Sequence, residues 1–284
     1  MCGQSTLLKA LLLAPLAFYP IWEALYIKLT RINLESAKLP PGTPPISMLF
    51  LSDLHISRRG RRERNLHRLL THCPQVDLLL LGGDIAREER GMALALDILS
   101  AVKASAGVFA VLGNSEHKNG APTEQLAQMM RDRGVQILVN ENKSVSLKGY
   151  KVAIAGVDDP YEGLDRPEAA LSGIPNDRLK ILLAHSPEVI VHMAGLTVDL
   201  ILAGHTHGGQ IRLPKMRALY THNVRGVQLD SGMFTSEALR QYNPKIADGI
   251  SMYISRGVGC SLIPARFLCP PEVVLITVSP ASEK

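Results

Sequence analysis

The chain has 284 residues, of which 46% are hydrophobic and 20% are charged, which excludes disorder for most of its length and predicts a sizeable core. Its cysteines, Cys2, Cys73, Cys260 and Cys269, show no CxxC spacing, which argues against a disulfide scaffold and a thiolate zinc site. The formal net charge of +5 is a modest excess that suits an anionic partner such as phosphate, a nucleotide or an acidic lipid surface. With only 5% aromatic residues, stacking on single-stranded nucleic acid is unsupported, and no nucleic-acid partner is expected.

The first thirty residues differ from the rest of the chain. Residues 10–22 carry no charge, and apolar residues continue past Glu23 to Ile27. This stretch is short for a membrane span, which needs about twenty residues. A signal peptide, a tilted membrane anchor, an interfacial helix and a buried core helix therefore all stay open. We predict that residues 1–30 form an apolar membrane-anchoring segment and that residues 31–284 form one globular domain.

The charges around this segment predict its orientation if it spans a bilayer. Lys9 stands alone before it, whereas Lys28, Arg31 and Lys38 follow it, and five further arginines lie between residues 58 and 64. The positive-inside rule then favours a globular part on the cytoplasmic side.

Short apolar runs from residue 46 onward predict buried strands, because they are too short for most helices and rich in branched residues. They cover residues 46–51, 76–81, 107–112, 135–139, 151–157, 179–184 and 198–203. Helical patterns lie between several of them, at residues 64–73, 88–105, 122–133 and 187–194. This alternation predicts an α/β sandwich with a mixed sheet. The part from residue 209 is expected to add strands and long loops to the same domain.

Acidic, imidazole and amide side chains follow directly after five of these predicted strands. They are Asp53, His55, Asp84, Asn114, His185, His205 and His207. The carboxyl ends of strands in an open α/β sheet border one crevice, and alternate residues such as those of D-x-H and H-x-H point the same way. Each of these residues alone is more often a turn former or a hydrogen-bonded histidine. Together, seven nitrogen and oxygen donors without a thiolate suit two divalent cations such as Mn, Zn or Fe.

These motifs resemble, in order and spacing, those of the calcineurin-like metallophosphoesterase superfamily. The segments LSDLHIS, GHTHGGQIRLP and SRGVGCSLIPARFLCPPEV are similar to its membrane-associated bacterial phosphodiesterase branch, which includes UDP-diacylglucosamine pyrophosphatases of lipid A synthesis. The resemblance covers residues 23–278 and implies a four-layer α/β/β/α sandwich of mixed sheets for a metallophosphoesterase domain at residues 31–284. It also implies a dinuclear hydrolase associated with the inner membrane.

The resemblance assigns the metal ligands residue by residue. It gives Asp53, His55 and His207 to one metal and Asn114, His185 and His205 to the other, with Asp84 bridging them. A carboxylate suits the bridge because its two oxygens and its negative charge hold two cations together against their repulsion. Such a pair of cations would lower the pKa of a shared water and neutralise charge on phosphate oxygens.

One departure from the family pattern concerns the general acid. Most members continue the G-N motif with histidine, whereas this chain has Ser115, followed by Glu116 and His117. A serine hydroxyl is a poor proton donor at neutral pH. Either His117 takes over catalysis together with Asn114, or the leaving group needs little protonation, or the protein is catalytically weak.

The basic run that follows the D-x-H motif is a candidate substrate contact. Arg58 and Arg59 would meet a diphosphate or an anionic membrane surface, although such runs are as often simply solvated. Four further histidines are expected to be structural or exposed: His67, His72, His192 and His222.

The sequence thus predicts a membrane-associated, dinuclear metal-dependent hydrolase of phosphodiester or pyrophosphate bonds on a lipid-linked or nucleotide-linked substrate. A protein or small-molecule phosphomonoesterase is one alternative. A catalytically weak metal-binding scaffold is another, because Ser115 replaces the usual histidine.

Overall fold

The computed structural model describes residues 18–118, 121–214, 218 and 220–282. Two six-stranded sheets form its centre. The first has the strand order β1 (Lys28–Ser36), β12 (Glu272–Pro280), β2 (Ile46–Leu51), β3 (Leu78–Gly82), β4 (Val108–Val111) and β5 (Val135–Ile137). The second has the order β10 (Gly232–Thr235), β11 (Ser251–Ile254), β9 (Leu200–Ala203), β8 (Lys180–Leu183), β7 (Tyr150–Gly156) and β6 (Glu141–Leu147).

Both sheets mix parallel and antiparallel pairs. The pairs from β2 to β5 and from β7 to β9 are parallel, as is β9 with β11. Antiparallel pairs join β12 to β2, β6 to β7 and β10 to β11. The carboxyl ends of the central parallel strands therefore meet at one edge of each sheet, where loops gather.

Alternation along the strands divides the apolar residues among three cores. Met48, Phe50 and Leu80 point into the core between the two sheets, together with residues of the second sheet. Leu49 and Leu81 point to the other face, where they join the apolar faces of helices α2 (Arg61–Thr71), α3 (Glu89–Leu99) and α5 (Thr123–Arg131). This period of two follows from the pleat of a strand.

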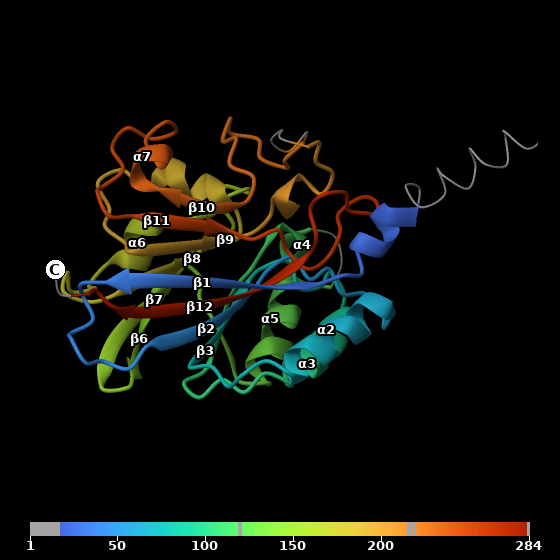
Figure 1. Ribbon diagram of the computed structural model, residues 1–284, viewed down its shortest axis with the longest axis horizontal. Coiled ribbons are helices and arrows are strands. Elements are labelled where there is room, and N and C mark those ends of the chain that lie inside the picture. Colours follow the sequence, from blue (N-terminus) through green and yellow to red (C-terminus); the bar gives the residue numbers. More distant parts are fainter. Residues whose placement is uncertain (1–17, 119–120, 215–217, 219, 283–284) are drawn as a thin grey trace, which may run out of the picture.

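A third core lies on the outer face of the second sheet. It is covered by α6 (Pro167–Leu171), the 3₁₀ helix η1 (Pro187–His192) and α7 (Ser236–Leu239). Figure 1 shows α6 and α7 on the side of the molecule opposite α2, α3 and α5. The chain therefore forms the predicted four-layer α/β/β/α sandwich of mixed sheets.

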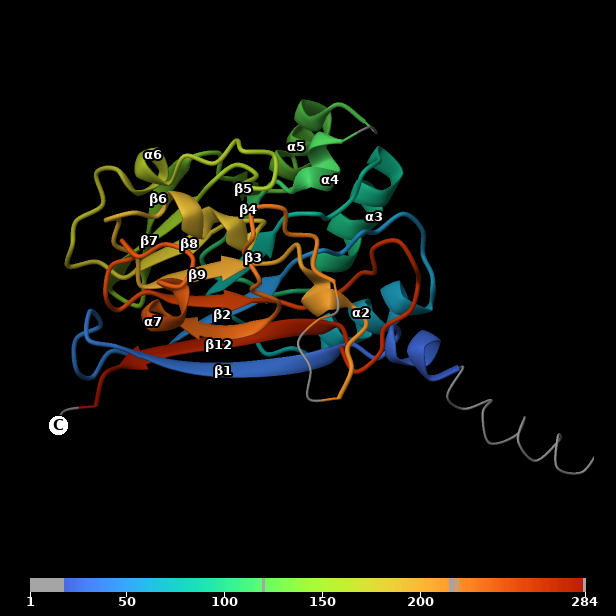
Figure 2. The same ribbon diagram turned by 90° about the horizontal axis from the view of Figure 1, so that it is seen from above.

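Several elements differ from the sequence prediction, among them the short helices α4 (Asn114–His117), α6 and α7, which it lacks. Residues 187–192 form a 3₁₀ helix, not an α-helix. Strand β6 has no counterpart in the prediction because it is polar and half-exposed at the end of its sheet. Strand β1 is also new: it pairs in parallel with β12 along the outer edge of the first sheet, as Figure 2 shows. Its polar and apolar residues alternate, so it lacks the continuous apolar run that predicts a buried strand.

The predicted apolar segment falls largely outside the described residues, since the description begins at Phe18. Residues 18–23 are helical, and β1 begins at Lys28, before the predicted domain boundary at residue 31. Among the described residues, no helix is both long and apolar enough to cross a bilayer.

Candidate metal centre

The polar residues predicted at the strand ends come together between the two sheets. Asp53 and His55 follow β2, Asp84 follows β3, and Asn114 begins the short helix α4 (Asn114–His117) after β4. The second sheet contributes three histidines from the loops after β8 and β9: His185, His205 and His207. All seven predicted ligands therefore lie at one site.

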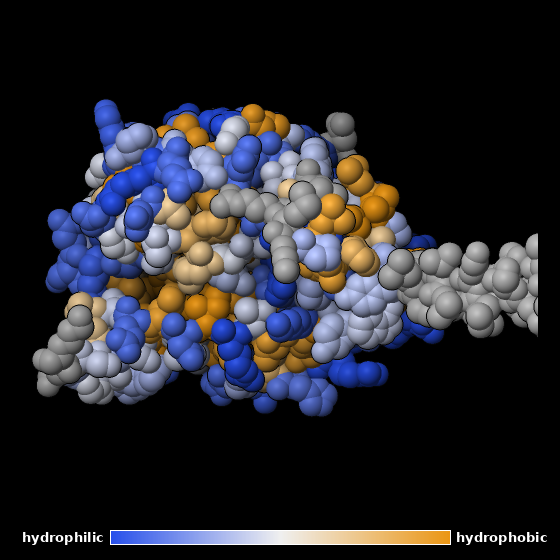
Figure 3. Space-filling model, turned by 45° about the horizontal axis from the view of Figure 1, so that its top comes forward, coloured by the Kyte–Doolittle hydropathy of each residue, from blue (hydrophilic) through white to orange (hydrophobic). Residues whose placement is uncertain are grey.

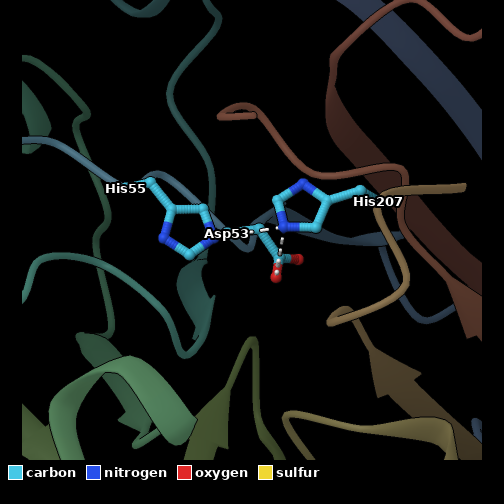
Figure 4. A group of neighbouring side chains, drawn as sticks. All are labelled: Asp53, His55 and His207. Atoms are coloured by element: carbon cyan, nitrogen blue, oxygen red, sulfur yellow. Dashed lines mark hydrogen bonds and ion pairs between the residues drawn. The ribbon is translucent and has the colours of Figure 1, made fainter. Parts of the chain in front are cut away.

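One group of ligands consists of Asp53, His55 and His207, whose donor atoms lie within 4.8 Å of one another. Figure 4 shows the two imidazole rings on either side of the Asp53 carboxylate. The Nε2 atoms of His55 and His207 are 3.1 Å apart, and Asp53 Oδ1 is 3.7 Å from His207 Nε2. Two imidazole nitrogens that face each other at this distance need a proton or a cation between them.

A second group lies beside the first. Asp53, Asp84 and His185 also have donor atoms within 4.8 Å of one another. His185 Nε2 is 3.0 Å from Asn114 Oδ1 and 3.2 Å from His205 Nδ1, so amide oxygen and a second imidazole complete the set. Again two imidazole nitrogens face each other, which fits a cation held between them.

Asp84 lies between the two groups. Its Oδ2 is 3.4 Å from His55 Nε2, and its Oδ1 is 3.4 Å from His185 Nε2. The Ser115 backbone N–H donates to Asp84 Oδ1 at 2.7 Å and holds the carboxylate in this position. One carboxylate oxygen for each group is the arrangement that a bridge between two cations requires.

The backbone of the ligand loops is strained. Asp53, His55, Asp84, His205 and His207 all have φ between 45° and 70°, a region that costs a non-glycine residue about 1–2 kcal/mol. Gly204 lets the loops approach: a Cβ atom there would lie 2.4 Å from Asp53 Oδ2. Such strain persists where the surrounding fold dictates the conformation, and it is concentrated at functional sites.

Burial and mutual charge shift the ionisation of these ligands. Burial raises the pKa of Asp53 to about 6. Burial also acts on Asp84, but His185 and His55 outweigh it and lower the pKa of that carboxyl to about 2. For His185, burial is outweighed by Asp84, Asp53 and Asp159, and its pKa rises to about 9. A strongly negative pocket that keeps a proton on one imidazole is suited to exchanging that proton for a metal ion.

Glu116 organises the loops that carry these ligands, a role the sequence did not reveal. Its buried carboxylate accepts hydrogen bonds from the backbone N–H groups of Gly113 at 2.8 Å and Asp84 at 3.0 Å. It also accepts from Ile85 at 2.7 Å and Ala86 at 3.1 Å. Glu116 thereby ties the loop after β3 to the loop after β4. The feature of the sequence that could have identified Glu116 is its position two residues after Asn114.

His117 lies at the end of α4 and faces a second acidic pair. Its Nε2 is 2.8 Å from Asp158 Oδ1, and this hydrogen bond raises the pKa of the imidazole. Asp159 is fully buried, and its Oδ2 has no hydrogen-bond partner among the described residues. Ser115 itself is buried, with its Oγ 3.5 Å from His55 Nδ1. The acidic loop after β7 is thus a sixth strand end that contributes to this edge.

The two predicted substrate contacts lie in different surroundings. Arg59 pairs with Asp97 of α3 at 2.7 Å on the exposed surface. Arg58 lines a cavity of about 390 Å³ that begins at His55. Arg61 and Arg62 line the same cavity, and Arg62 donates to the His55 carbonyl oxygen at 3.2 Å.

Two further residues near the centre come from the last third of the chain. The ring of His222 lies 5.9 Å from that of His205 and 6.0 Å from that of His207, measured between centroids, whereas the sequence analysis expects a structural or exposed residue outside the site. Arg266 is fully buried and donates to the His207 carbonyl oxygen at 3.3 Å. Both come from loops distant in sequence, so no local spacing could have identified them.

Comparison with known proteins agrees with this geometry. Residues 46–209 match the family described as calcineurin-like phosphoesterase, and the chain belongs to that family. It is a metal-dependent phosphoesterase, a hydrolase with a candidate binuclear metal centre.

The individual relatives span most of the chain. The uncharacterized protein YpbG of Bacillus subtilis is 30% identical over 84% of this chain and 82% of its own length. The uncharacterized metallophosphoesterase YkuE of the same organism is 28% identical over 89% and 85%. The phosphodiesterase YaeI of Escherichia coli is 29% identical over 82% of each chain.

Proposed function

We propose that this phosphoesterase cleaves a phosphodiester or pyrophosphate bond in a lipid-linked or nucleotide-linked substrate, a class that includes UDP-diacylglucosamine. The observation that carries this proposal is the cavity beside His55. Its lining includes Arg58, Arg61 and Arg62 together with apolar residues, among them Leu25 and Leu262. A substrate with an anionic part and an apolar part fits such a lining.

A second cavity of about 400 Å³ also begins at His55 and is lined by Arg87 and Ser261. Cys260 and Leu262 line both cavities. A diester or a diphosphate has a substituent on each side of its scissile bond. Two cavities that meet at one metal ligand therefore favour such a substrate over a simple monoester.

Two divalent cations, manganese in our proposal, would be held by the seven ligands and would supply a nucleophilic hydroxide and neutralise phosphate charge. The protein's own residues do the rest. Arg58 and Arg87 bind the phosphate oxygens and orient the substrate in the two cavities. His117, held by Asp158, keeps a proton that it donates to the leaving oxygen. Asn114 holds its amide oxygen beside His185.

Ser115 favours a leaving group that departs easily. If His117 replaces the usual histidine only in part, the lost general acid catalysis costs up to about 10²- to 10⁴-fold, and most when an alkoxide must leave. A phosphate monoester is a better leaving group, since its second pKa is about 6. A pyrophosphate bond would therefore tolerate Ser115 better than an alkyl diester.

The test compares five substrates with manganese and detergent-purified protein: bis-p-nitrophenyl phosphate, p-nitrophenyl phosphate, a UDP-linked acylated glucosamine, an alkyl phosphodiester and a phosphopeptide. Each assay is repeated with Asp84→Asn and with the surface control Asp97→Asn. We expect the UDP-lipid to be turned over fastest and Asp84→Asn alone to abolish turnover. Equal turnover of alkyl diesters and nucleoside diphosphate compounds would contradict the pyrophosphate proposal.

The same assay decides between the alternatives. Phosphopeptide or aryl monoester turnover far above that of any diester would identify a phosphomonoesterase. Absence of turnover with all substrates, despite two bound metals, would identify a metal-binding scaffold, which the substitution at Ser115 favours. The intact set of seven ligands favours an enzyme, because a scaffold has no need of a bridging carboxylate.

We further propose that the protein is associated with the cytoplasmic face of the inner membrane through its N-terminal segment. The apolar sequence before Phe18 and the basic residues that follow it support this location. Cell fractionation followed by protease treatment of sealed vesicles of either orientation tests it. Protection of the globular part in inside-out vesicles would overturn the orientation.

A further inference from the structure

The mouth of the cavity beside His55 has two walls that come from distant parts of the chain. One wall is the N-terminal region, residues 18–25, of which Ala24 and Leu25 in the turn after the helix line the cavity. The other is the loop that contains Leu262, Ile263 and Pro264. The two walls are joined directly, since the Arg266 backbone N–H donates to the Pro20 carbonyl oxygen at 2.8 Å.

Large apolar side chains stand exposed on both walls. On the loop, Leu262 is 89% exposed and Ile263 is 52% exposed. On the N-terminal region, Trp22 is 55% exposed, and Phe18 and Ile21 are exposed beside it. Figure 3 shows apolar surface at the end of the molecule where the N-terminal region lies. Contiguous exposed apolar surface on a globular protein indicates a protein or membrane contact.

Basic side chains border the same mouth. Arg58 and Arg61 are exposed, line the cavity and have no hydrogen-bonded or ion-paired partner for their side chains among the described residues. By contrast, Arg59 nearby is neutralised by Asp97. Apolar side chains flanked by uncompensated arginines match a bilayer with anionic headgroups, since the former enter the acyl boundary and the latter meet phosphate.

We propose that these residues form a docking surface for an anionic lipid bilayer, which places the mouth of the catalytic cavity directly on the membrane. The surface consists of Phe18, Ile21, Trp22, Arg58, Arg61, Leu262 and Ile263. The described chain begins within this surface, at Phe18, and residues 10–17 before it are uncharged in the sequence. The proposal extends the proposed function, because a lipid substrate would enter the cavity from the bilayer.

The single tryptophan of the chain, Trp22, lies in this surface and is a natural reporter. Its emission should shift to the blue when phosphatidylcholine vesicles containing 30% phosphatidylglycerol are added to the full-length protein. To report on the loop alone, Leu262→Trp is made in a Trp22→Phe background. The loop indole should then be quenched by lipids brominated near the top of the acyl chain. Val139→Trp in the same background, at a residue 42% exposed outside the surface, is the matched control.

Charge and apolar contacts are separated by two further variants. Arg58→Gln combined with Arg61→Gln should weaken binding to the anionic vesicles about 25-fold, or about fivefold for each arginine, with little change for neutral vesicles. Leu262→Asp combined with Ile263→Asp should weaken binding to both vesicle types. An unquenched loop indole, or equal binding of all variants, would overturn the proposal.

Hydrolysis of soluble bis-p-nitrophenyl phosphate by a Phe18→Asp, Ile21→Asp variant, whose substitutions lie in the docking surface but outside the cavity lining, distinguishes this proposal from the proposed function. We expect its rate to stay within about twofold of the parent while vesicle binding is lost. If the parent protein binds vesicles but hydrolyses none of the substrates, the docking surface is supported and the proposed hydrolytic function is contradicted. Binding of a soluble protein at this surface without quenching by brominated lipid would replace the bilayer with a protein partner.

Discussion

Arg266 and His207 are joined twice: the guanidinium donates to the His207 carbonyl oxygen at 3.3 Å and lies 3.5 Å from its Nδ1. The remaining donors of Arg266 bind backbone carbonyl oxygens of Arg256, Gly257, Gly259 and Cys269. This fully buried arginine, held mostly by backbone carbonyl groups, fixes the loop that contains it against a candidate metal ligand. Mutation of a residue that orients a metal ligand in this way typically lowers metal affinity or activity about 10- to 100-fold.

Arg266→Lys should therefore lower the affinity for manganese about 10- to 100-fold at the site that includes His207. Lysine keeps the charge but lacks the planar fork that reaches several carbonyl groups at once. Calorimetric titration with manganese measures the effect, and Arg240→Lys, at an exposed ion pair with Asp248, is the control. Unchanged affinity in both variants would show that Arg266 serves folding alone.

Glu116→Gln should destabilise the protein by about 2–4 kcal/mol, because an amide accepts with one oxygen and its NH₂ group opposes backbone donors. The four N–H groups that now bind the carboxylate would be only partly satisfied. Urea unfolding of the metal-free protein measures the change. Glu124→Gln, at an exposed residue of α5, should leave the midpoint unchanged.

Metal affinity should rise with pH between about 7 and 9. The pKa of His185 is raised to about 9 in the metal-free protein, whereas a metal ion binds the neutral imidazole. Each binding event below pH 9 must release that proton, so the apparent affinity gains up to tenfold per pH unit. Asp53, with its pKa near 6, is already charged in this range.

Calorimetry in buffers of different ionisation enthalpy measures the proton release directly, and about one proton per protein molecule, from the site that includes His185, is expected at pH 7. The raised pKa of His185 also affects folding. It stabilises the metal-free protein fully below about pH 6.5, and this contribution is lost as the pH rises through 9. A metal affinity independent of pH over this range would contradict a protonated His185.

His117→Asn should slow cleavage of alkyl diesters about 10²- to 10⁴-fold and leave p-nitrophenyl esters nearly unaffected, because only a poor leaving group needs the proton. The hydrogen bond to Asp158 raises the pKa of His117, so this imidazole keeps its proton to higher pH. Rates for the alkyl substrate should accordingly fall as pH rises through the pKa of His117. The measurement is a pH–rate profile for both kinds of substrate.

His222→Asn is the informative comparison for that experiment. The His222 ring packs against the rings of His205 and His207, so its loss should slow both kinds of substrate by a similar factor. If His222→Asn were selective for alkyl diesters and His117→Asn were not, the proton donor would be His222.

The sequence predicts the buried part of the fold well and its borders poorly. Continuous apolar runs identify β2, β3, β8 and β9, because these strands are covered on both faces. Polar residues directly after these strands predict the metal ligands, because parallel strands end at one edge of the sheet. Strand β1 alternates and lies at the sheet edge, so its register depends on β12, more than 240 residues away.

The supporting residues of the site could not be predicted for a similar reason. Arg266 reaches His207 across 59 residues, and Glu116 reaches Asp84 across 32. Neither contact leaves a periodicity or spacing in the sequence. Which arginine faces the cavity is equally a matter of loop conformation, as the different surroundings of Arg58 and Arg59 demonstrate.

The pairing of β1 with β12 also determines how the molecule would bear mechanical load. The two strands run in parallel from Lys28 opposite Glu272 to Ser36 opposite Pro280. A pull between an N-terminus held in place and the C-terminus would act along the strands in opposite directions. The hydrogen bonds of this ladder would then be sheared together, not opened one after another. Force applied through a tether at the start of the chain would therefore be resisted first by this ladder, in its strongest geometry.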